Sequence, residues 1–503
     1  MICAVCFGES LEEIERQISL VVNQPITVIE IRVDGLKTID YERLGKIIKN
    51  LQYPVILTLR SQWKDIRINE PLEGRASIIS KLIDLEPNYL DLEFPQDLKL
   101  IKEVHKKTTI VLSLLDFYGM AKIPIDTALD LVNHNSNIII KIAATPNSIE
   151  DMKLLWKWSS KLSKLNLPNI IVGMGELGKV TRIKSLELKN LWMYGRAENI
   201  QGEPFIPGML SIDTLNRAFS DDSWHFATIE SNPRTESTIF HPILDRIIQQ
   251  AELNGVFVDV PISNRVDLSQ FLLWVNDGLL DGLLVSHPWQ HEVLTSIDET
   301  DQSVRLTRRS NCIIPTKSGL KGYNTYVEAI HRSLTPYSKK KLGRVYIEGE
   351  GNYIYPIIAA IRDFADLIVV RGVREEDVKT VISDFSEVIP SDEAFSDSYD
   401  LVINNLSPEI GFEKISPIPP AIMNQAKLVF DPVSSIFTSS ATLQKAEKLN
   451  IPTVSSWNFI LNSLLYSFEL LTKQSVPFHS INQTEVYDKI HQFEGIQWPP
   501  HSS

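Results

Sequence analysis

One lysine, Lys141, interrupts an apolar run that reads Ile-Ile-Ile-Lys-Ile-Ala-Ala over residues 138–144. Burial in such a run disfavours the charged ammonium form, and the neutral amine is a nucleophile that can attack a carbonyl carbon. The alternative is a lysine whose charged end reaches water or pairs with a nearby carboxylate. The residues that lie beside Lys141 therefore decide between a catalytic and a structural role.

The elements that must position this lysine follow a regular pattern up to about residue 222. Short β-rich runs alternate there with amphipathic helical patterns, which is typical of βα units around a parallel sheet. Eight strands are predicted, over residues 2–7, 27–33, 54–60, 89–94, 108–114, 137–143, 169–174 and 191–195. Helical periodicity occupies segments between them, including residues 10–22, 41–51, 95–107 and 148–162. The pattern predicts an α/β fold with an N-terminal TIM (β/α)8 barrel, and a flavodoxin-like open sheet is the weaker alternative.

Polar residues close several of these apolar runs. In a TIM barrel the reacting groups lie at the carboxyl ends of the strands. The residues found there are Glu30, Arg32, Arg60, Glu93, Ser113 and Lys141. Because parallel strands of a barrel are covered on both faces, a solvent-exposed face does not account for so many charges. This pattern favours a functional role for Lys141.

Four segments resemble type I 3-dehydroquinate dehydratase over roughly residues 1–222. They read Glu30-Ile-Arg-Val-Asp, Tyr89-Leu-Asp-Leu-Glu, Ile140-Lys-Ile-Ala and Met174-Gly-Glu-Leu-Gly-Lys-Val-Thr-Arg. The resemblance implies that Lys141 forms an imine with the substrate ketone, that Glu93 supports a catalytic histidine, and that water leaves through an enamine without a cofactor. It also implies that the hydroxyl and carboxylate groups of the substrate are held by Glu30, Arg32, Arg60 and Arg182.

The chain departs from the family pattern at two motifs. Ser-x-His-Asp-Phe reads Ser-Leu-Leu-Asp-Phe here, which places Leu115 where the general acid–base histidine belongs. The lid motif Ser-Ala-Pro-Gly-Gln reads Phe-Ile-Pro-Gly-Met, so that Phe205 and Met209 replace two polar substrate-binding groups. A general acid–base group contributes on the order of 10²–10⁴-fold in rate. A barrel that keeps its imine lysine without that group is therefore expected to be slow.

A second α/β pattern begins near Trp224, with a strand over residues 225–230, a helix over 240–254 and a strand over 256–260. A later strand, residues 345–348, leads through Gly-Glu-Gly-Asn into an apolar helix over residues 354–364. A Gly-x-Gly turn in this context can bind a dinucleotide pyrophosphate through backbone amides at the helix N-terminus. Glu350 and Tyr353 add negative charge and bulk to the turn, and a purely structural turn is the alternative.

Further motifs in this half resemble shikimate dehydrogenase, whose fusion behind a type I dehydratase is a known arrangement. They read Thr235-Glu-Ser, Leu284-Val-Ser-His-Pro-Trp-Gln, Ser310-Asn-Cys, Gly322-Tyr-Asn-Thr-Tyr and Asp400-Leu-Val-Ile-Asn. The resemblance implies that Thr235 and Ser237 bind the shikimate carboxylate and that Asn311 and Asn324 contact its surroundings. It implies NADP as the cofactor, contacted by Gly349, Gly351, Asn352, Arg371 and Arg374.

The reactive pair of this second family is replaced. Its lysine corresponds to Gln290 and its aspartate to Tyr326, and neither replacement exchanges a proton near neutral pH. The glutamine of the family near the C-terminal helix falls near Ser463.

Composition excludes several other classes of protein. The formal charge of the 503 residues is −13 and no cluster of Lys and Arg is present, which argues against a nucleic-acid partner. No run approaches the roughly 18 apolar residues of a membrane span, and no basic segment precedes the apolar N-terminus, so we expect a cytoplasmic protein without a membrane partner. The cysteines are Cys3, Cys6 and Cys312, and on a strand the first two face opposite sides, so neither a metal site nor a redox pair is expected.

We accordingly predict a dehydratase-like barrel over residues 1–222, a shikimate-binding α/β domain over 223–335, a Rossmann-like NADP-binding domain over 336–475 whose C-terminal helix returns to the substrate domain, and a tail over 476–503. The predicted function is bifunctional: dehydration of 3-dehydroquinate through a lysine imine, and NADPH-dependent reduction of 3-dehydroshikimate. The partners would be these small molecules, and the protein a monomer or homodimer. Two alternatives remain open, a catalytically impaired paralogue that acts as a binding or scaffold protein, and a lysine-imine, aldolase-like enzyme with a different substrate.

Overall fold

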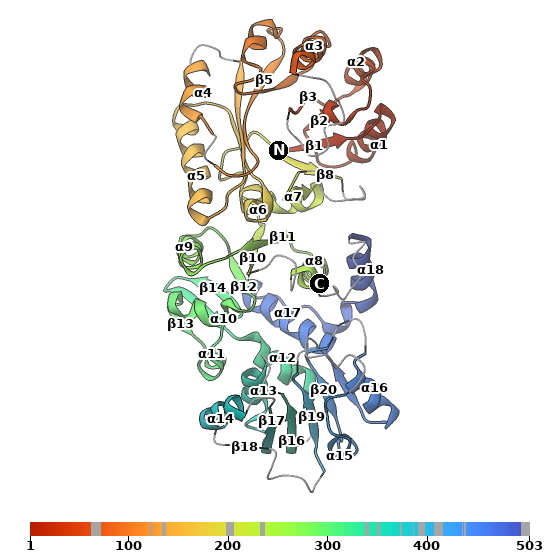
Figure 1. The fold of residues 1–503 in the computed structure, drawn as a ribbon, viewed down its shortest axis with the longest axis vertical. Coiled ribbons are helices and arrows are strands. Elements are labelled where there is room, and N and C mark those ends of the chain that lie inside the picture. The colour runs from red at the N-terminus through yellow and green to blue at the C-terminus, as the bar shows by residue number, and fades with distance from the viewer. Residues whose placement is uncertain are drawn as a thin grey trace. The chain divides into compact units, whose positions relative to one another are not determined.

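The computed structural model describes residues 1–61, 72–120, 123–132, 137–197, 206–231, 237–337, 342–349, 353–372, 375–385, 387–390, 398–406, 416–434, 436 and 439–493. The chain forms two compact units (Figure 1). The first comprises residues 1–225 and 254–270, and the second comprises residues 226–253 and 271–503. The predicted division at residues 222, 335 and 475 stays a prediction.

The first unit contains a curled parallel sheet of nine strands in the order β7-β6-β5-β4-β3-β2-β1-β8-β9. The strands are β1 (Ile2–Phe7), β2 (Val28–Arg32), β3 (Val55–Thr58), β4 (Tyr89–Glu93), β5 (Thr109–Asp116), β6 (Ile138–Ala144), β7 (Asn169–Gly173), β8 (Met193–Arg196) and the short β9 (Leu210–Ser211). Each of the eight predicted strands coincides with one of β1 to β8. The predicted barrel is confirmed, and the open-sheet alternative is wrong.

Asn190 helps to close the barrel between β7 and β8, where Leu191 N also donates to Asn169 O at 3.1 Å. Asn190 forms a parallel bridge with Asn169, and its side chain accepts a hydrogen bond from Ile171 N at 2.6 Å. The Asn190 amide also donates to Ile171 O at 3.0 Å. The asparagine thus supplies both hydrogen bonds that a neighbouring strand would otherwise give to Ile171.

Helices surround this sheet. They are α1 (Leu11–Val21), α2 (Tyr41–Asn50), α3 (Leu72–Ile83), α4 (Ile125–Val132), α5 (Ile149–Lys164), α6 (Gly175–Ile183) and α7 (Ile212–Ala218), with 3-10 turns η1 (Val33–Gly35) and η2 (Leu98–Glu103). Helices α1 and α5 begin where Ser10 and Ser148 accept hydrogen bonds from the backbone three residues later, as N-cap residues do.

The helix predicted over residues 95–107 is wrong in type and length, because only the 3-10 helix η2 forms there. Asp97 accepts hydrogen bonds from Glu93 N at 2.8 Å and from Arg75 Nε at 2.9 Å. These contacts hold the start of the segment against the end of β4. The remaining turn buries Leu100 alone among its own residues, which gives a longer helix little apolar surface to cover.

A mixed six-stranded sheet follows, in the order β11-β10-β12-β14-β15-β13. Its strands are β10 (Trp224–Glu230), β11 (Gly255–Pro261), β12 (Gly282–Val285), β13 (Glu299–Thr300), β14 (Cys312–Thr316) and β15 (Gly319–Tyr323). The accompanying helices are α8 (Ser237–Gln250), α9 (Arg265–Asn276), α10 (Trp289–Glu292), η3 (Val293–Ser296), α11 (Gln302–Thr307) and α12 (Thr325–Leu334). The first strand, helix and second strand agree with the three elements predicted after Trp224, although α8 begins and ends a few residues earlier.

The third sheet has the strand order β18-β17-β16-β19-β20-β21, with every pair parallel. This is the doubly wound 3-2-1-4-5-6 arrangement of dinucleotide-binding domains. Its strands are β16 (Leu342–Glu348), β17 (Ala365–Arg371), β18 (Val388–Pro390), β19 (Leu401–Asn404), β20 (Val429–Asp431) and β21 (Thr453–Ser455). The helices are α13 (Ile354–Ile361), α14 (Glu375–Asp384), α15 (Pro420–Met423), α16 (Ala441–Lys448) and α17 (Ser456–Thr472).

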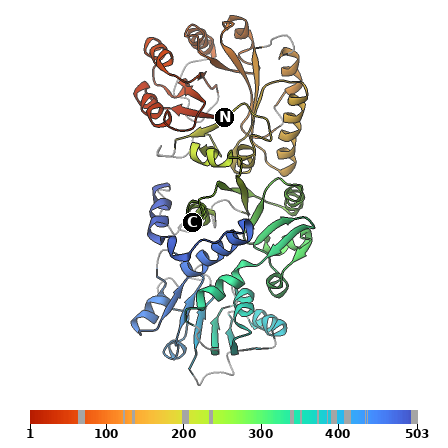
Figure 2. The same cartoon turned by 180° about the vertical axis from the view of Figure 1, so that it is seen from behind.

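Helix α17 leaves this third sheet and lies beside α12 in both views (Figures 1 and 2). Thr325 and Ser463 share a hydrogen bond of 3.0 Å between their hydroxyl groups, and Asn462 donates to Ser333 Oγ at 3.0 Å. The long helix therefore joins the two sheets of the second unit.

The segment predicted as a tail contains regular structure. A 3-10 turn, η6 (Phe478–Ser480), leads into helix α18 (Gln483–Phe493). Val486 of α18 is buried, and Glu485 pairs with Arg246 of α8 at 2.7 Å. The prediction of an unstructured tail missed this helix, because the helix packs through few apolar residues and an ion pair and its apolar periodicity is weak.

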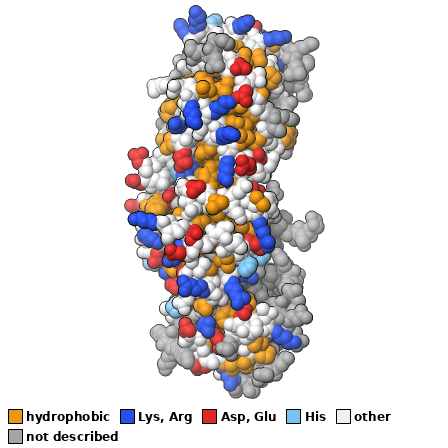
Figure 3. Space-filling model, turned by 90° about the vertical axis from the view of Figure 1, so that its left-hand side faces the viewer, with side chains coloured by type: hydrophobic (Ala, Val, Ile, Leu, Met, Phe, Trp, Pro, Cys, Tyr) orange, Lys and Arg blue, Asp and Glu red, His pale blue; other side chains and the backbone are white. Residues whose placement is uncertain are grey.

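Charge and hydropathy add two observations. On the face drawn in Figure 3, acidic and basic side chains of the described residues are interspersed, and neither sign gathers into one broad patch. Within the described ranges no helix is long and apolar enough to cross a membrane.

Candidate active site

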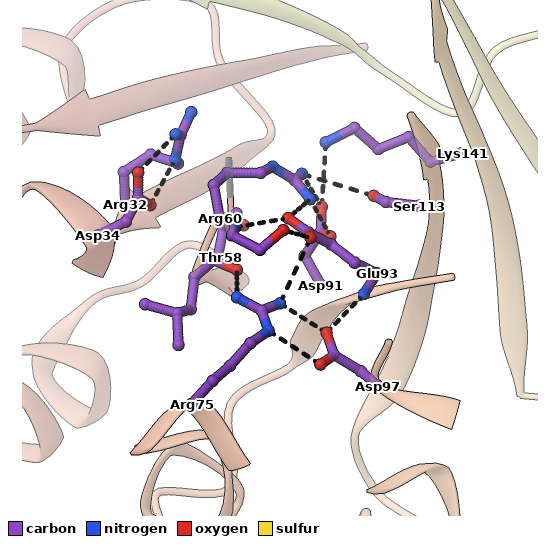
Figure 4. Close-up of polar contacts among 12 residues, drawn as sticks. Arg32, Asp34, Thr58, Arg60, Arg75, Asp91, Glu93, Asp97, Ser113 and Lys141 are labelled. Carbon is purple, nitrogen blue, oxygen red and sulfur yellow. Dashed lines mark hydrogen bonds and ion pairs between the residues drawn. The ribbon is translucent and has the colours of Figure 1, made fainter. Parts of the chain in front are cut away.

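The carboxyl ends of the barrel strands bring one group of charged side chains together. Glu30 comes from β2. Arg60 follows β3, Glu93 ends β4 and Lys141 lies on β6 (Figure 4). Each of these four side chains is buried. Glu30, Arg60 and Lys141 line one cavity, and Glu93 accepts a hydrogen bond from Arg60 at 3.5 Å.

Lys141 is 6% exposed and is surrounded by three groups that attract a cation. Its Nζ donates to Asp91 Oδ2 at 3.0 Å and lies 3.8 Å from Glu30 Oε1. It also lies 4.2 Å from the ring centroid of Tyr194 on β8, within cation–π range. Lys141 therefore does not stand isolated; it is a member of a buried network of charged groups.

Arg60 fastens two carboxylates of β4 in place. Its Nη1 donates to Asp91 Oδ1 at 2.7 Å and to Glu93 Oε1 at 3.5 Å. Burial by itself would raise the pKa of Asp91, but Arg60 and then Lys141 lower that pKa to about 2. Asp91 is consequently an ionised carboxylate that pairs with both cations and is a weak base.

Glu93 is held from the other side as well. Ser61 donates to Glu93 through its backbone N at 3.1 Å and through its hydroxyl. Arg75 Nη2 lies 3.8 Å from Glu93 Oε2. The carboxylate thus has several partners but no histidine among the described residues around it, which leaves positioning of Arg60 as its visible role.

Two further arginines line the same cavity, and they differ in whether a carboxylate is hydrogen-bonded to the guanidinium. Arg32 is clamped by Asp34, whose carboxylate accepts from Nε at 2.8 Å and from Nη2 at 2.7 Å. Arg182 of α6 is fully buried, and its Nη2 donates a long hydrogen bond of 3.4 Å to Pro207 O. The Nε and Nη1 atoms of Arg182 have no hydrogen-bond partner among the described residues. Burial lowers the pKa of this guanidinium to about 10.

An apolar wall completes the cavity. Leu115 lies on β5 at the position expected for a histidine, and it lines the cavity together with Phe117, Met174 and Ile206. Met209, three residues after Ile206, is buried. Phe205 lies outside the described residues. No described residue that lines this cavity is a histidine.

The second unit places the substituted reactive pair in contact. Gln290 Nε2 donates to Tyr326 Oη at 3.3 Å and to Val285 O at 3.1 Å. Tyr326 packs edge-on against Tyr353 at 5.2 Å between ring centroids, and Phe459 lies 5.3 Å from it. An aromatic cluster therefore occupies the junction between α12, the start of α13 and α17.

Two predicted substrate-binding residues, Asn311 and Asn324, form hydrogen bonds with other residues of this unit. Asn311 accepts from Thr325 N at 2.7 Å and donates to Thr325 Oγ1 at 2.9 Å. Asn324 caps α12 and donates to Thr307 Oγ1 at 2.8 Å. Thr235 lies outside the described residues, as does the side chain of Ser237.

Comparison with known proteins gives the relationship of the barrel. The family model described as type I 3-dehydroquinase matches residues 2–223. The 3-dehydroquinate dehydratase of Methanocaldococcus jannaschii is 30% identical over 200 residues, which cover 37% of this chain and 84% of the relative.

The chain belongs to the type I 3-dehydroquinase family.

The likeness extends beyond the dehydroquinase barrel. The "Shikimate biosynthesis protein AroDE" of Chlamydia pneumoniae is 23% identical over 490 residues, which cover 93% of this chain and 95% of that protein. A solved structure titled "Dehydroquinate dehydratase and shikimate dehydrogenase from S. pombe AroM" covers 97% of this chain and 98% of that chain at 18% identity, with a TM-score of 0.45. The resemblance that the motifs of both halves indicated is thus confirmed by the full-length relative.

Sequence reasoning missed two residues of the dehydroquinase site, Asp91 and Tyr194. Asp91 stands two residues before Glu93, so that both side chains project from the same face of β4. That spacing was a signal that could have placed Asp91 in the site. Tyr194 carried no comparable signal, because its contact with Lys141 depends on the closure of the barrel through β8.

The cofactor that the second half implies can be tested against its described residues. Gly349 follows β16 with φ of 97°, a conformation that favours glycine, and the crevice of a doubly wound sheet lies at this strand end. Arg371 ends β17, but its Nη1 lies 3.5 Å from Glu348 Oε2. Gly351, Asn352 and Arg374 lie outside the described residues.

The backbone arrangement therefore fits a dinucleotide, with Arg371 as the cation that would meet a 2′-phosphate. The charge of Glu348 opposes such a phosphate. In the described part of the chain no group of three or more His, Cys, Asp and Glu residues could hold a metal ion.

Proposed function

We propose that the barrel dehydrates 3-dehydroquinate to 3-dehydroshikimate through an imine at Lys141. The observation that carries this proposal is one cavity lined by both Lys141 and Arg182, whose Nε and Nη1 have no hydrogen-bond partner among the described residues. A buried arginine with free donors is suited to a carboxylate, and a lysine at the end of a barrel strand is suited to a ketone. 3-Dehydroquinate carries both groups.

The reaction begins when Lys141, after losing a proton, attacks the ketone carbon. The C–N bond forms, the former ketone oxygen takes up protons and leaves as water, and the cationic imine remains beside Asp91. The imine makes the adjacent carbon acidic, so that loss of its proton gives an enamine, which expels the protonated ring hydroxyl as water. Water then hydrolyses the conjugated imine, which breaks the C–N bond, releases 3-dehydroshikimate and regenerates Lys141. Asp91 and Tyr194 stabilise the positive charge at nitrogen before and after imine formation.

Leu115 determines the expected rate of this reaction. Removal of the α-proton and protonation of the leaving hydroxyl need a group that changes its charge near neutral pH, and Leu115 offers none. Asp91, with its pKa of about 2, is a poor substitute. We propose that the barrel forms the imine readily and completes the dehydration slowly.

The proposal is tested by incubating the full chain with 3-dehydroquinate and borohydride, followed by mass spectrometry of the peptide that contains Lys141. The expected result is a reduced adduct on Lys141 in the wild type and none in Lys141→Met. Absence of an adduct in the wild type would overturn the imine mechanism. An adduct without product release would indicate a binding protein, the second candidate function.

For the second unit we propose the reduction of 3-dehydroshikimate with NADPH. Its support is the full-length likeness to the AroDE protein and the doubly wound strand order. NADPH would supply the hydride, and Gly349 with Arg371 would hold the nucleotide. The contact of Gln290 with Tyr326 favours the impaired alternative for this half, because neither group exchanges protons near neutral pH.

The setting of these activities is part of the proposal. We propose that the protein acts in the cytoplasm on these small molecules, as a monomer or homodimer. Its substrates need neither nucleic acid nor a membrane.

A further inference from the structure

Most polar side chains that line the barrel cavity already have hydrogen-bond or ion-pair partners within the protein. Glu30 accepts a hydrogen bond from Thr58 at 2.8 Å, Arg60 pairs with Asp91 at 2.7 Å, and Arg32 pairs with Asp34 at 2.7 Å. A substrate hydroxyl that binds to any of these groups must compete with an existing partner. This polar wall therefore offers little net gain for ring hydroxyls.

Arg182 differs from these residues because it is fully buried and two of its nitrogen atoms have no partner in the part of the chain that the structure describes. Leaving such donors unpaired is costly, and an anion bound to them recovers that cost. Among the described lining residues, Arg182 is thus the one best suited to bind a ligand, and the ligand group that suits it is a carboxylate or a similar anion.

The opposite wall is apolar where a polar substrate would need partners. Leu115 and Ile206 line the cavity, and both belong to the two motifs in which the chain departs from its family. A hydroxyl pressed against such a wall loses its hydrogen bonds to water, which disfavours binding by on the order of tenfold for each group. Phe117 and Met174 extend this surface.

We propose that this cavity prefers cyclic keto acids that lack the ring hydroxyls of 3-dehydroquinate. The carboxylate binds Arg182, the ketone reacts with Lys141, and the unsubstituted ring carbons face Leu115 and Ile206. This inference rests on the imine function of Lys141, and it names the class of ligand that the altered walls select. The sequence left open a lysine-imine enzyme with a different substrate. For that alternative, the inference specifies the substrate as a cyclic keto acid without ring hydroxyls.

The covalent step balances without any further reactant. The neutral amine of Lys141 adds to the ketone carbon, the carbinolamine oxygen takes up protons and leaves as water, and a cationic imine remains. Added cyanoborohydride supplies a hydride to that carbon and converts the imine into a stable secondary amine on Lys141.

The test compares two probes on the full wild-type chain, 3-dehydroquinate and 3-oxocyclohexane-1-carboxylate. Each is titrated with cyanoborohydride present, and the fraction of Lys141 peptide modified is measured by mass spectrometry. We expect half-maximal labelling by the dehydroxylated acid at a concentration at least about tenfold lower, as the loss of unfavourable hydroxyl contacts implies. Uncharged cyclohexanone should label more weakly than the acid, and Arg182→Gln should abolish that difference.

A matched pair of variants isolates the apolar wall. Leu115→Asn keeps the branched shape and the number of side-chain heavy atoms of leucine and supplies hydrogen-bonding groups, so it should shift the preference toward 3-dehydroquinate. Leu115→Met keeps the wall apolar and should leave the preference unchanged.

Tighter labelling of the wild type by 3-dehydroquinate than by the dehydroxylated acid would overturn the inference while leaving the imine function intact. Failure of every ketone to label Lys141 would overturn both. The comparison on the wild type decides the matter even if Leu115→Asn does not fold.

Discussion

Lys141 attacks as a neutral amine, but its nitrogen is a cation before the attack and again once the imine has formed. The ammonium ion and the imine that replaces it are both cations, and Asp91 at 3.0 Å and the Tyr194 ring at 4.2 Å attract either one. The network therefore holds the nitrogen in place without choosing between free lysine and intermediate. The described residues around Lys141 include no general acid or base suited to neutral pH, because Leu115 occupies the position expected for a histidine.

Replacing Leu115 with histidine should restore that group. A histidine that titrates near neutral pH at this point of β5 would serve as general acid and base, so we expect dehydration of 3-dehydroquinate to accelerate on the order of 100-fold. The rate is followed by the ultraviolet absorbance of the conjugated product. Leu115→Asn is the control, because it adds polarity without proton transfer, and an equal gain in both variants would contradict the interpretation.

Removing the charge of Asp91 should destabilise the barrel. Asp91→Asn leaves Arg60 and Lys141 buried without their shared carboxylate, and such a loss costs about 3–5 kcal/mol. Chemical denaturation of the variant against the wild type measures this cost. Glu42→Gln, which breaks the exposed pair with Lys46, is the control and should change the free energy of unfolding by less than about 1 kcal/mol.

The same carboxylate predicts a pH dependence. Because the pKa of Asp91 is lowered on folding to about 2, its contribution to stability is complete above the ordinary aspartate range and is lost as the pH falls toward 2. The difference in unfolding free energy between wild type and Asp91→Asn should shrink over that interval. A difference that stayed constant from pH 5 to about pH 2 would argue against the ion pairing.

At the scale of elements, the barrel depends on one seam. Strands β7 and β8 meet through Asn190 rather than through a full ladder, and two hydrogen bonds of its side chain satisfy Ile171. Asn190→Ala removes both, so we expect a loss of about 1–3 kcal/mol in the free energy of unfolding, measured by urea denaturation. Leu186→Ala, at an exposed position four residues away, should have little effect. An Asn190→Ala protein as stable as wild type would show that the seam closes without this side chain.

The turn after β16 carries a second prediction at this scale. Glu348 forms an ion pair with Arg371. Glu348→Gln should therefore free the guanidinium for a phosphate. We expect NADPH affinity to rise by about fivefold, as for a partly exposed pair. Titration calorimetry measures the affinity, which we expect to be weak in the wild type. Glu387→Gln is the matched control, since it breaks the pair with Arg362 at the opposite ends of the strands. Micromolar affinity in the wild type would contradict the inhibitory role of Glu348.

Element prediction from sequence succeeded where periodicity was strong and failed where contacts between distant segments decided. The strand that contains Lys141 was read from its apolar residues, and β6 forms there. The segment after Pro95 showed helical spacing, yet the contacts of Asp97 with Arg75 and with the backbone of Glu93 stop it as a short 3-10 turn. Helix α18 was missed because its periodicity is weak.

For the whole molecule, each proposed activity is contained within one compact unit. Lys141, Arg182 and their partners all lie in residues 1–225, whereas Gln290, Tyr326 and Arg371 all lie in the second unit. Substitutions at separate sites without shared partners usually have independent effects.

Lys141→Met should therefore abolish imine labelling and leave the calorimetric titration with NADPH unchanged. Conversely, Glu348→Gln should leave labelling of Lys141 unchanged. A change in nucleotide affinity on replacing Lys141 would contradict this independence and indicate coupling between the units.

The sequence by itself determined the strands of the barrel, the charges at their carboxyl ends and the absence of a histidine at Leu115, because these features follow from short-range periodicity and residue type. Only the tertiary structure decided which charges are paired. Arg60, Asp91 and Lys141 are far apart along the chain, and their contacts depend on the register of β3 through β6. The same folding leaves Nε and Nη1 of Arg182 buried without a hydrogen-bond partner among the described residues, since α6 places the guanidinium beside the cavity.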